Sequence, residues 1–507
     1  MYKNPTGRSI SQSFDWKLVL MYLLLIFIGW INVYASIHAD GSEGILDWGT
    51  RSGKQFVWIM TSLGLAALIL FVIPPRIWES ASVPLYLVAL GLLVAVIFLG
   101  VDVKGSKSWF EFGPVRFQPA EISKITTSLV LAAYMSRSSF KMSRAGDFLL
   151  MATIILIPMA VILGESETGS ALVYIGFVFM LYREGLSGWL LVAIGMAILL
   201  FILTLKNSSY TAMTVLLAVL LVCNSARAKR VFPAMTVSAL TVLALAFLPS
   251  LMMAVTEHFT PGASVLDSVD ASVAGSIRAA GRMTWMIAVK PVYILSALAA
   301  CAIPWVLVKS YHAKNGFAAF SVAAFLLGAA LSFSTDFLFN DVLQDHQRKR
   351  IEVLLGMKED LSGVGYNVHQ SMIAIGSGGL FGKGFLNGTQ TTFGFVPEQS
   401  TDFIFCTVGE EWGFAGCLVV ILLYVGMIWR LVRDAESCRG RFSRIYGYCV
   451  AGCIFMHLFI NVGMTIGLMP VIGIPLPFMS YGGSSLWAFT ILLFIFIALY
   501  HEEKKYF

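Results

Sequence analysis

The sequence predicts an all-α polytopic membrane protein, and three observations carry that prediction. First, 58% of the 507 residues are apolar and only 13% are charged, whereas soluble domains carry roughly 25% charge. Second, the mean hydropathy is +0.80. Third, the apolar residues form long continuous runs, unlike the short alternating segments of an outer-membrane barrel. This composition excludes a soluble enzyme and a disordered chain. The net charge of +6 is spread over short loops, which excludes a nucleic-acid-binding domain.

Fourteen apolar runs are candidate spans, because a helix needs about 20 mostly apolar residues to cross a bilayer. In chain order they cover 16–36, 55–74, 81–100, 121–136, 147–164, 168–182, 187–205, 209–223, 231–254, 291–310, 315–333, 403–429, 445–468 and 483–500. The first run is too long for the apolar region of a signal peptide and lacks a clear cleavage site, so it is predicted to be the first span.

Basic residues gather in alternate loops between these runs, which is typical of cytoplasmic loops. The loops around Arg76, Arg183 and Arg230 are basic, whereas those around Glu43 and Glu257 are acidic. With an even number of spans, both termini are predicted to face the cytoplasm. The four longest loops then lie on the outer side of the membrane, at about 37–54, 101–120, 255–290 and 334–402.

The longest outer loop, 334–402, mixes glycine and polar residues with Phe, Leu and Ile. This mixture indicates an ordered loop with short amphipathic helices, and long ordered loops often carry function, although a passive periplasmic cap is the alternative. Asp402 ends the loop at the entrance to the run 403–429. A carboxylate at that boundary is only partly desolvated and could act as a base. The alternative is a helix N-cap, and the two roles are compatible.

Two pairs of charged residues lie inside or at the edge of predicted spans. Glu410 and Glu411 sit one to two turns inside the run 403–429. Ionisable residues inside a membrane span usually have a function, but an ion pair with a neighbouring helix explains these two equally well. Glu121 and Lys124 are i,i+3 neighbours behind Pro119. They form either a charged wall for an anionic headgroup or an intrahelical ion pair.

Two further segments have unusual backbone composition. Lys383 stands among five glycines in IGSGGLFGKG, and glycines allow a backbone to approach a phosphate closely. The spacing is not that of a P-loop, so an anionic-headgroup site is the expectation. Pro475 and Pro477 forbid a continuous helix before the last span. A broken backbone at membrane depth must be buried in protein or line a cavity.

Four stretches together resemble the SEDS proteins (shape, elongation, division and sporulation), the family that includes RodA and FtsW. They are WFEFGPVRFQPAEISK at 109–124, GYNVHQSMIAIGSGGLFGKGFLNGTQ at 365–390, FVPEQSTDFIF at 395–405 with GEEWGFAG at 409–416, and NVGMTIGLMPVIGIPLPFMSYGGSS at 461–485. They are long and occur in the family's order. The GKGFLNGTQ form of the loop is more similar to RodA than to FtsW.

The resemblance implies a peptidoglycan glycosyltransferase in the bacterial cytoplasmic membrane. Such an enzyme polymerises lipid II into glycan strands on the outer side, beside a class B penicillin-binding protein. Asp402 matches the family's essential extracellular Asp, and Glu121, Lys124 and Lys383 match charged residues of its motifs. The expected substrate-binding residues are Lys383, Arg116, Glu121, Lys124, Arg348, Arg350, Gln370 and Glu398.

The sequence departs from the family pattern at three positions and in length. Ser108 stands where Arg is common, Ala120 where Ser is common, and Glu167 where Asp is common. The usual member has ten spans, so about four are predicted to be inserted. The expected organisation is an N-terminal membrane region 1–205, an inserted segment 206–333, a large extracellular catalytic loop 334–402 and a C-terminal membrane region 403–507.

The mechanism implied is inverting transfer, in which Asp402 takes the proton of the acceptor hydroxyl and cations stabilise the departing undecaprenyl pyrophosphate. A divalent cation, Mg²⁺ or Mn²⁺, could share that role, although the sequence shows no dedicated ligand cage. The seven cysteines form no CxxC and no Cys/His cluster, so no zinc or redox site is expected.

Two alternatives to the enzyme stay open. A flippase or other transporter of lipid-linked precursors would explain broken helices and intramembrane glutamates, but it predicts an internal two-fold repeat that the sequence does not clearly show. A non-catalytic scaffold of the elongation or division machinery would leave Asp402 and Lys383 without a task.

Overall fold

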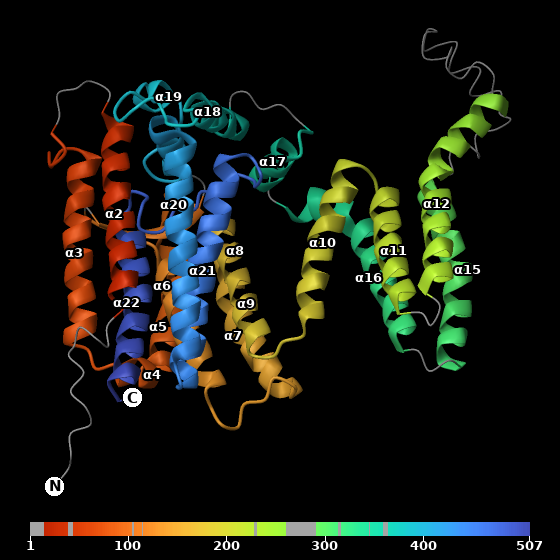
Figure 1. The fold of residues 1–507 in the computed structure, drawn as a ribbon, viewed down its shortest axis with the longest axis horizontal. Coiled ribbons are helices and arrows are strands. Elements are labelled where there is room, and N and C mark those ends of the chain that lie inside the picture. Colours follow the sequence, from red (N-terminus) through yellow and green to blue (C-terminus); the bar gives the residue numbers. More distant parts are fainter. Residues whose placement is uncertain are drawn as a thin grey trace. The chain divides into compact units, whose positions relative to one another are not determined.

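The computed structural model describes residues 15–38, 44–103, 106–113, 115–227, 231–259, 291–312, 316–343, 345–357 and 363–506. The chain forms two compact units (Figure 1). Unit 1 comprises Met1–Ser187 and Lys349–Phe507, and unit 2 comprises Gly188–Arg348. Most described residues are helical, which confirms the predicted all-α membrane class.

Each of the fourteen predicted spans coincides with helical structure. Among the described residues, eleven helices are long and apolar enough to cross a membrane. The other three predicted spans correspond to the 17-residue α6 (Pro119–Met135), to α15 (Pro291–His312), and to the stretch in which the 3-10 turn η1 (Tyr174–Gly176) separates α8 (Thr168–Val173) from α9 (Phe177–Arg183).

Unit 1 joins helices from both ends of the chain in one bundle (Figure 1). Its remaining helices are α2 (Trp16–Ile37), α3 (Arg51–Phe71), α4 (Arg76–Ser80), α5 (Ser82–Leu99), α7 (Ala145–Gly164), α17 (Asp345–Leu354, which begins in unit 2), α18 (Val364–Ser377), α19 (Thr389–Thr392), α20 (Ile404–Ser437), α21 (Arg441–Thr465) and α22 (Gly483–Tyr506). Helix α21 contacts α6, α9, α20 and α22 and is the most buried of the candidate spans.

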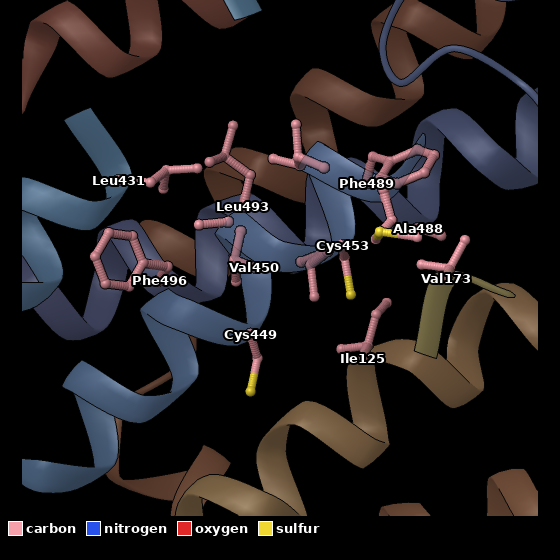
Figure 2. Close-up of a cluster of buried hydrophobic side chains, with 14 of the residues drawn as sticks. Ile125, Val173, Leu431, Cys449, Val450, Cys453, Ala488, Phe489, Leu493 and Phe496 are labelled. Atoms are coloured by element: carbon pink, nitrogen blue, oxygen red, sulfur yellow. The ribbon is translucent and has the colours of Figure 1, made fainter. Parts of the chain in front are cut away.

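The core of unit 1 lies around α21 and α22. Figure 2 shows buried side chains of these two helices in one cluster with Ile125 of α6, Val173 of α8 and Leu431 of α20. Cys449 and Cys453 are fully buried and behave as small core side chains. This packing brings α6 and α8 from the first half of the sequence onto the C-terminal helices that follow Asp402.

Residues 101–117 form a small antiparallel sheet of β1 (Val101–Val103), β2 (Ser106–Phe112) and β3 (Val115–Phe117), where the sequence predicted only a loop. In β2, Ser106 and Ser108 are buried whereas Lys107 between them is exposed, which is the period of a strand. The hydropathy pattern does not reveal this alternation of buried and exposed residues, because the buried positions carry serine rather than an apolar residue.

The segment 466–482 between α21 and α22 contains no helix, as its prolines predicted. Ile474, Leu476 and Met479 are buried in the core. Its backbone carbonyls accept hydrogen bonds from side chains of neighbouring helices, for example from the Tyr424 hydroxyl to Pro477. The broken backbone is therefore satisfied inside the protein.

Unit 2 contains α10 (Gly188–Lys206), α11 (Ser209–Ala226), α12 (Val231–Phe259), α15, α16 (Gly316–Phe337) and the π-helical turn η3 (Leu338–Val342). Helix α10 packs against α11 and α16. For that reason the unit begins at 188 and ends at 348, whereas the predicted insertion covers 206–333. Most of the predicted outer loop 255–290 lies outside the described residues.

Candidate active site

Asp402 lies at the end of an ordered loop whose last three backbone carbonyls accept hydrogen bonds. The carbonyls of Ser400, Thr401 and Asp402 each accept a hydrogen bond from the C-terminal part of the chain. The donors, in the same order, are the Tyr481 backbone N–H at 2.8 Å, the Ser480 hydroxyl at 2.6 Å and the Asn461 side-chain amide at 2.8 Å. The position of Asp402 is thus set by segments about 60 to 80 residues later in the chain.

The Asp402 side chain is half-buried and does not cap α20. The N-cap residue of α20 is Phe403, which makes no side-chain cap hydrogen bond, so the prediction that Asp402 is the N-cap is wrong. A Cβ added at Gly473 would lie 3.3 Å from Asp402 Oδ2, and Gly473 has a φ of +73°. Both its left-handed backbone and the close approach of the carboxylate therefore favour glycine there.

Among the predicted substrate-binding residues, Arg350 is a cation whose pKa is affected by the charge of Asp402. Burial lowers the pKa of Arg350, while the charges of Glu167 and Asp402 oppose that shift. Its Nε is buried and makes no hydrogen bond among the described residues. Arg350 thus has a guanidinium nitrogen available for a further hydrogen bond, and its pKa responds to the charges of Glu167 and Asp402.

Two of the departures from the family pattern contact each other. The Ser108 hydroxyl donates to Glu167 Oε1 at 2.7 Å. The Ser106 hydroxyl lies 3.1 Å from the same oxygen, but its shorter hydrogen bond is to the Glu165 carbonyl at 2.8 Å. Strand β2 therefore contacts both the Glu167 carboxylate and the adjacent backbone. A serine at 108 is long enough for this contact because the carboxylate that it meets belongs to Glu.

Glu165 lies two residues from this contact and is 3% exposed. Neither of its carboxylate oxygens has a hydrogen-bond partner among the described residues. Burial and the charge of Glu167 raise the pKa of Glu165 to about 8. The side chain is therefore largely protonated at neutral pH, since an ionised buried carboxylate without partners is strongly disfavoured.

Lys383 donates to Glu410 Oε1 at 2.6 Å, and Glu410 is fully buried. Four more hydrogen bonds reach the same carboxylate, from the Thr389 hydroxyl, the Gln390 backbone N–H, and the N–H and hydroxyl of Thr391. Glu410 therefore forms an ion pair, but with a lysine of the preceding loop rather than with the neighbouring helix that the sequence analysis considered. The Glu410 carboxylate thus joins the start of α20 to the loop that contains Lys383.

The glycines around Lys383 serve a backbone contact with α20. Helix α20 is broken at Gly413, whose φ is +65°. The N–H groups of Lys383 and Gly384 donate to the carbonyls of Glu410 and Glu411, both at 3.0 Å. In return, Phe414 and Ala415 donate to the carbonyls of Gly379 and Leu380 at 2.9 and 3.0 Å. The glycine-rich loop thus supplies the partners that the broken helix lacks.

A Cβ at Gly382 would lie 2.1 Å from the Glu411 carbonyl oxygen, so a larger residue would push the two segments apart. Glu411 itself is 1% exposed, so its side chain also lies inside this contact. The composition that suggested a phosphate site is therefore explained by close backbone packing.

Glu121 and Lys124 form an ion pair of 2.7 Å and are 3% and 2% exposed. Lys124 Nζ also lies 2.8 Å from His457 Nε2 and 5.3 Å from the centre of the Phe489 ring. Between the two alternatives for this pair, the structure has the buried intrahelical pair. A headgroup would have to displace core side chains to reach it.

Three of the other predicted substrate-binding residues form contacts within their own segments. Arg116 pairs with Glu111 at 2.6 Å across the β2–β3 hairpin, and Arg348 pairs with Asp345 at 2.7 Å in α17. Glu398 has a φ of +54° and accepts from the Thr401 hydroxyl at 3.0 Å. Gln370 is half-buried in α18.

Three residues of this region were not identified from the sequence. Arg51 donates to the Ser400 hydroxyl at 2.6 Å and lies over the Tyr481 ring. His457 and Asn461 are buried in α21. His457 and Asn461 are polar residues four positions apart within an apolar run, and this pattern could have identified them from the sequence. Within the described parts of the chain, no group of three or more His, Cys, Asp or Glu side chains could hold a metal ion.

Comparison with known proteins gives consistent relatives over nearly the whole chain. The peptidoglycan glycosyltransferase MrdB of Escherichia coli K12 is 28% identical over 488 residues, covering 96% of this chain and 94% of the relative. The peptidoglycan glycosyltransferase RodA of Treponema pallidum is 29% identical over 487 residues, covering 95% of each. A probable FtsW of Trichlorobacter lovleyi is 23% identical over 477 residues, covering 93% and 89%, which agrees with the greater similarity to RodA.

A solved chain of a peptidoglycan synthase complex shares the fold, with a TM-score of 0.56 and 21% identity over 97% of this chain and 98% of that chain. The model of the FtsW/RodA/SpoVE family, described as a cell cycle protein, matches residues 15–235 and 262–505. That match includes much of the segment predicted to be inserted, so the insertion stays a prediction. The chain is a multi-pass bacterial membrane protein that belongs to the FtsW/RodA/SpoVE family, the SEDS proteins.

Proposed function

We propose that this protein polymerises lipid II into glycan strands, with Asp402 as the catalytic base, in cell wall synthesis during elongation. The relatives named peptidoglycan glycosyltransferase support the activity. The observation that carries the assignment of the base is the backbone support of Asp402: the carbonyls of residues 400–402 each accept a hydrogen bond from the C-terminal part of the chain, while Asp402 itself is only half-buried. A carboxylate on a rigid support is suited to a reaction that depends on orientation.

In this reaction Asp402 takes the proton from the acceptor sugar hydroxyl, and the oxygen forms a bond to the anomeric carbon of the donor. The bond from that carbon to the pyrophosphate oxygen breaks on the opposite side, so the configuration inverts. Undecaprenyl pyrophosphate leaves with increased negative charge, which a nearby cation stabilises. Arg350 is our first candidate for that cation, because its guanidinium is charged, incompletely hydrogen-bonded and subject to the field of Asp402.

Lys383, Lys124, Arg116 and Arg348 are less suited to the leaving group, because each already pairs with a carboxylate at 2.6–2.7 Å. Their charges are largely compensated locally. We assign Lys383 and Lys124 to the support of the site, and Arg116 to the outer hairpin.

The orientation and the partner are also proposals. The distribution of basic loops supports cytoplasmic termini and a site that faces the outside. A class B penicillin-binding protein is the proposed partner, supported by the structural relative that belongs to a peptidoglycan synthase complex.

The test is polymerisation of lipid II by the purified full-length protein, alone and with its penicillin-binding partner. Asp402→Asn keeps the size of the side chain and removes the base. Because general base catalysis contributes about 10²–10⁴-fold, we expect at least a hundredfold loss with unchanged thermal unfolding. Asp47→Asn, at an exposed loop carboxylate, is the matched control and should retain activity.

If the Asp402→Asn protein polymerises lipid II at the wild-type rate, the assignment of the base is wrong. If the wild-type protein moves lipid II across vesicles and never extends glycan strands, the flippase alternative replaces the enzyme. Absence of both activities, with the partner still bound and active, would favour a scaffold.

A further inference from the structure

Two buried side chains of α21, one helical turn apart, connect the Glu121–Lys124 pair with the backbone of Asp402. Asn461 is 0% exposed and His457 is 1% exposed. Because residues four apart lie on the same face of a helix, both reach the same stretch of the non-helical segment 466–482. Their contacts are with the adjacent carbonyls of Ile474 and Pro475.

Asn461 joins the loop of Asp402 to that segment. Its Nδ2 donates to the Asp402 carbonyl at 2.8 Å and to the Ile474 carbonyl at 2.7 Å. An amide nitrogen has two hydrogens, so both are used. The reverse orientation of the amide would place its oxygen against two carbonyl oxygens, so the hydrogen-bond network determines the assignment.

His457 joins the same segment to Lys124. The ammonium of Lys124 can only donate, so His457 Nε2, 2.8 Å away, accepts its hydrogen bond. The ring proton is then on Nδ1, which lies 3.1 Å from the Pro475 carbonyl and donates to it. The Glu121–Lys124 pair thus fixes the tautomer of His457, and His457 fixes the Pro475 carbonyl.

The same segment also approaches the Asp402 carboxylate. Gly473 directly precedes Ile474, and a Cβ added at Gly473 would lie 3.3 Å from Asp402 Oδ2. A shift of 473–475 would therefore change both the backbone anchor and the surroundings of the carboxylate. A displacement of about 1 Å in a catalytic group can reduce the rate by about a hundredfold.

We propose that Asn461 and His457 are positioning residues for Asp402, and that Glu121 and Lys124 act on the reaction through His457 without touching the substrate. The proposal rests on the role of Asp402 as the base. The proposal gives a function to the buried Glu121–Lys124 pair and to two polar residues of α21, the most buried candidate span.

The experiment measures lipid II polymerisation kinetics for Asn461→Ala, His457→Leu and His457→Gln in the full-length protein. Hydrogen exchange of the peptides spanning 396–405 and 470–482 is measured in parallel. Asn32→Ala is the matched control, since Asn32 is also a buried asparagine of a membrane helix, and among the described residues its amide donates within its own helix, to the Ile28 carbonyl.

We expect Asn461→Ala and His457→Leu to lower kcat about 10–100-fold with KM changed less than about threefold, because the base is displaced while the substrate still binds. Both peptides should exchange faster. His457→Gln keeps an acceptor for Lys124 and a donor for Pro475, so it should recover most of the rate. The double variant His457→Leu/Asn461→Ala should be less impaired than the product of the single effects, since both act through one segment. Asn32→Ala should change neither kcat nor exchange of the two peptides.

A wild-type kcat in Asn461→Ala would overturn the proposal, as would equal impairment by His457→Gln and His457→Leu. If Asn461→Ala does not fold, the comparison of Gln with Leu at 457 decides alone. If Asp402→Asn is fully active, the proposed base fails, whatever the α21 variants do.

Discussion

The two units of the protein bury different kinds of polar side chain. Unit 1 buries ionisable groups within or beside its helices, among them Glu121, Lys124, Glu410, Glu411 and His457. In unit 2, the polar side chains that the described residues bury all carry hydroxyls: Thr204, Ser225, Ser238, Ser321, Ser332 and Thr335. Hydroxyls join membrane helices at small energetic cost, whereas buried ionisable groups are expensive and need a task. The difference assigns the chemistry to unit 1.

The buried charges of unit 1 differ further in what they support. Lys383–Glu410 joins a loop to a broken helix, and Glu121–Lys124 leads through His457 to the Asp402 loop. We therefore assign both pairs to the support of the proposed site rather than to its open face. Breaking them should therefore affect folding or positioning, while changes in unit 2 should have small effects on both.

The largest effect on stability is expected from Glu410→Ala. This change leaves Lys383 and the N–H groups of Gln390 and Thr391 without their buried acceptor. Removing one partner of a buried pair destabilises a protein by about 3–5 kcal/mol. We expect a marked fall in the melting temperature of the purified protein, with loss of lipid II polymerisation that follows the loss of folded protein.

A double variant separates this structural role from headgroup binding. Lys383→Met/Glu410→Met removes both charges, and such apolar replacements are often neutral, so its melting temperature should exceed that of either single variant. Glu436→Gln, which breaks the exposed pair with Arg183, is the control and should lose at most about 1 kcal/mol. A Lys383→Met protein that melts like the wild type but no longer binds lipid II would instead support the headgroup role predicted from the sequence.

The membrane architecture could be predicted because apolar runs and loop charges are local features. All fourteen runs are helical, and the break at Pro475 and Pro477 is present. The partners of the charged residues could not be predicted, since they depend on how distant segments meet. The glycine-rich segment around Lys383 illustrates this: its composition predicted an anionic-headgroup site, but the N–H groups of Lys383 and Gly384 donate to the carbonyls of Glu410 and Glu411. Tertiary contacts of this kind leave no local pattern.

A smaller, pH-dependent effect is expected at Glu165. Its pKa is about 8 in the folded protein against an ordinary value of 4.5. Below pH 4.5 the group is protonated in both states and contributes no pH dependence. Between pH 4.5 and 8 the unfolded carboxyl loses its proton while the folded one keeps it, so stability falls as pH rises, and the full penalty is present above pH 8.

Glu165→Gln stays neutral throughout, so its melting temperature should fall less between pH 5 and 8 than that of the wild type, by a few degrees. Thermal unfolding over that range measures the difference. Glu79→Gln, at an exposed carboxylate, is the control and should follow the wild type. If the melting temperatures of the wild type and Glu165→Gln change equally with pH, Glu165 is not held in its protonated form.

The smallest effect is expected in unit 2, at the buried hydroxyl pair of Thr204 and Ser332. Their oxygens are 2.9 Å apart, and Thr204 also donates to the Leu200 carbonyl of its own helix. Hydrogen bonds between membrane helices contribute about 0.6 kcal/mol on average. Thr204→Val and Ser332→Ala should therefore lower the melting temperature only slightly and leave lipid II polymerisation unchanged. A large loss of polymerisation with intact folding in either variant would contradict the assignment of the chemistry to unit 1, because the only change would be a hydroxyl contact inside unit 2.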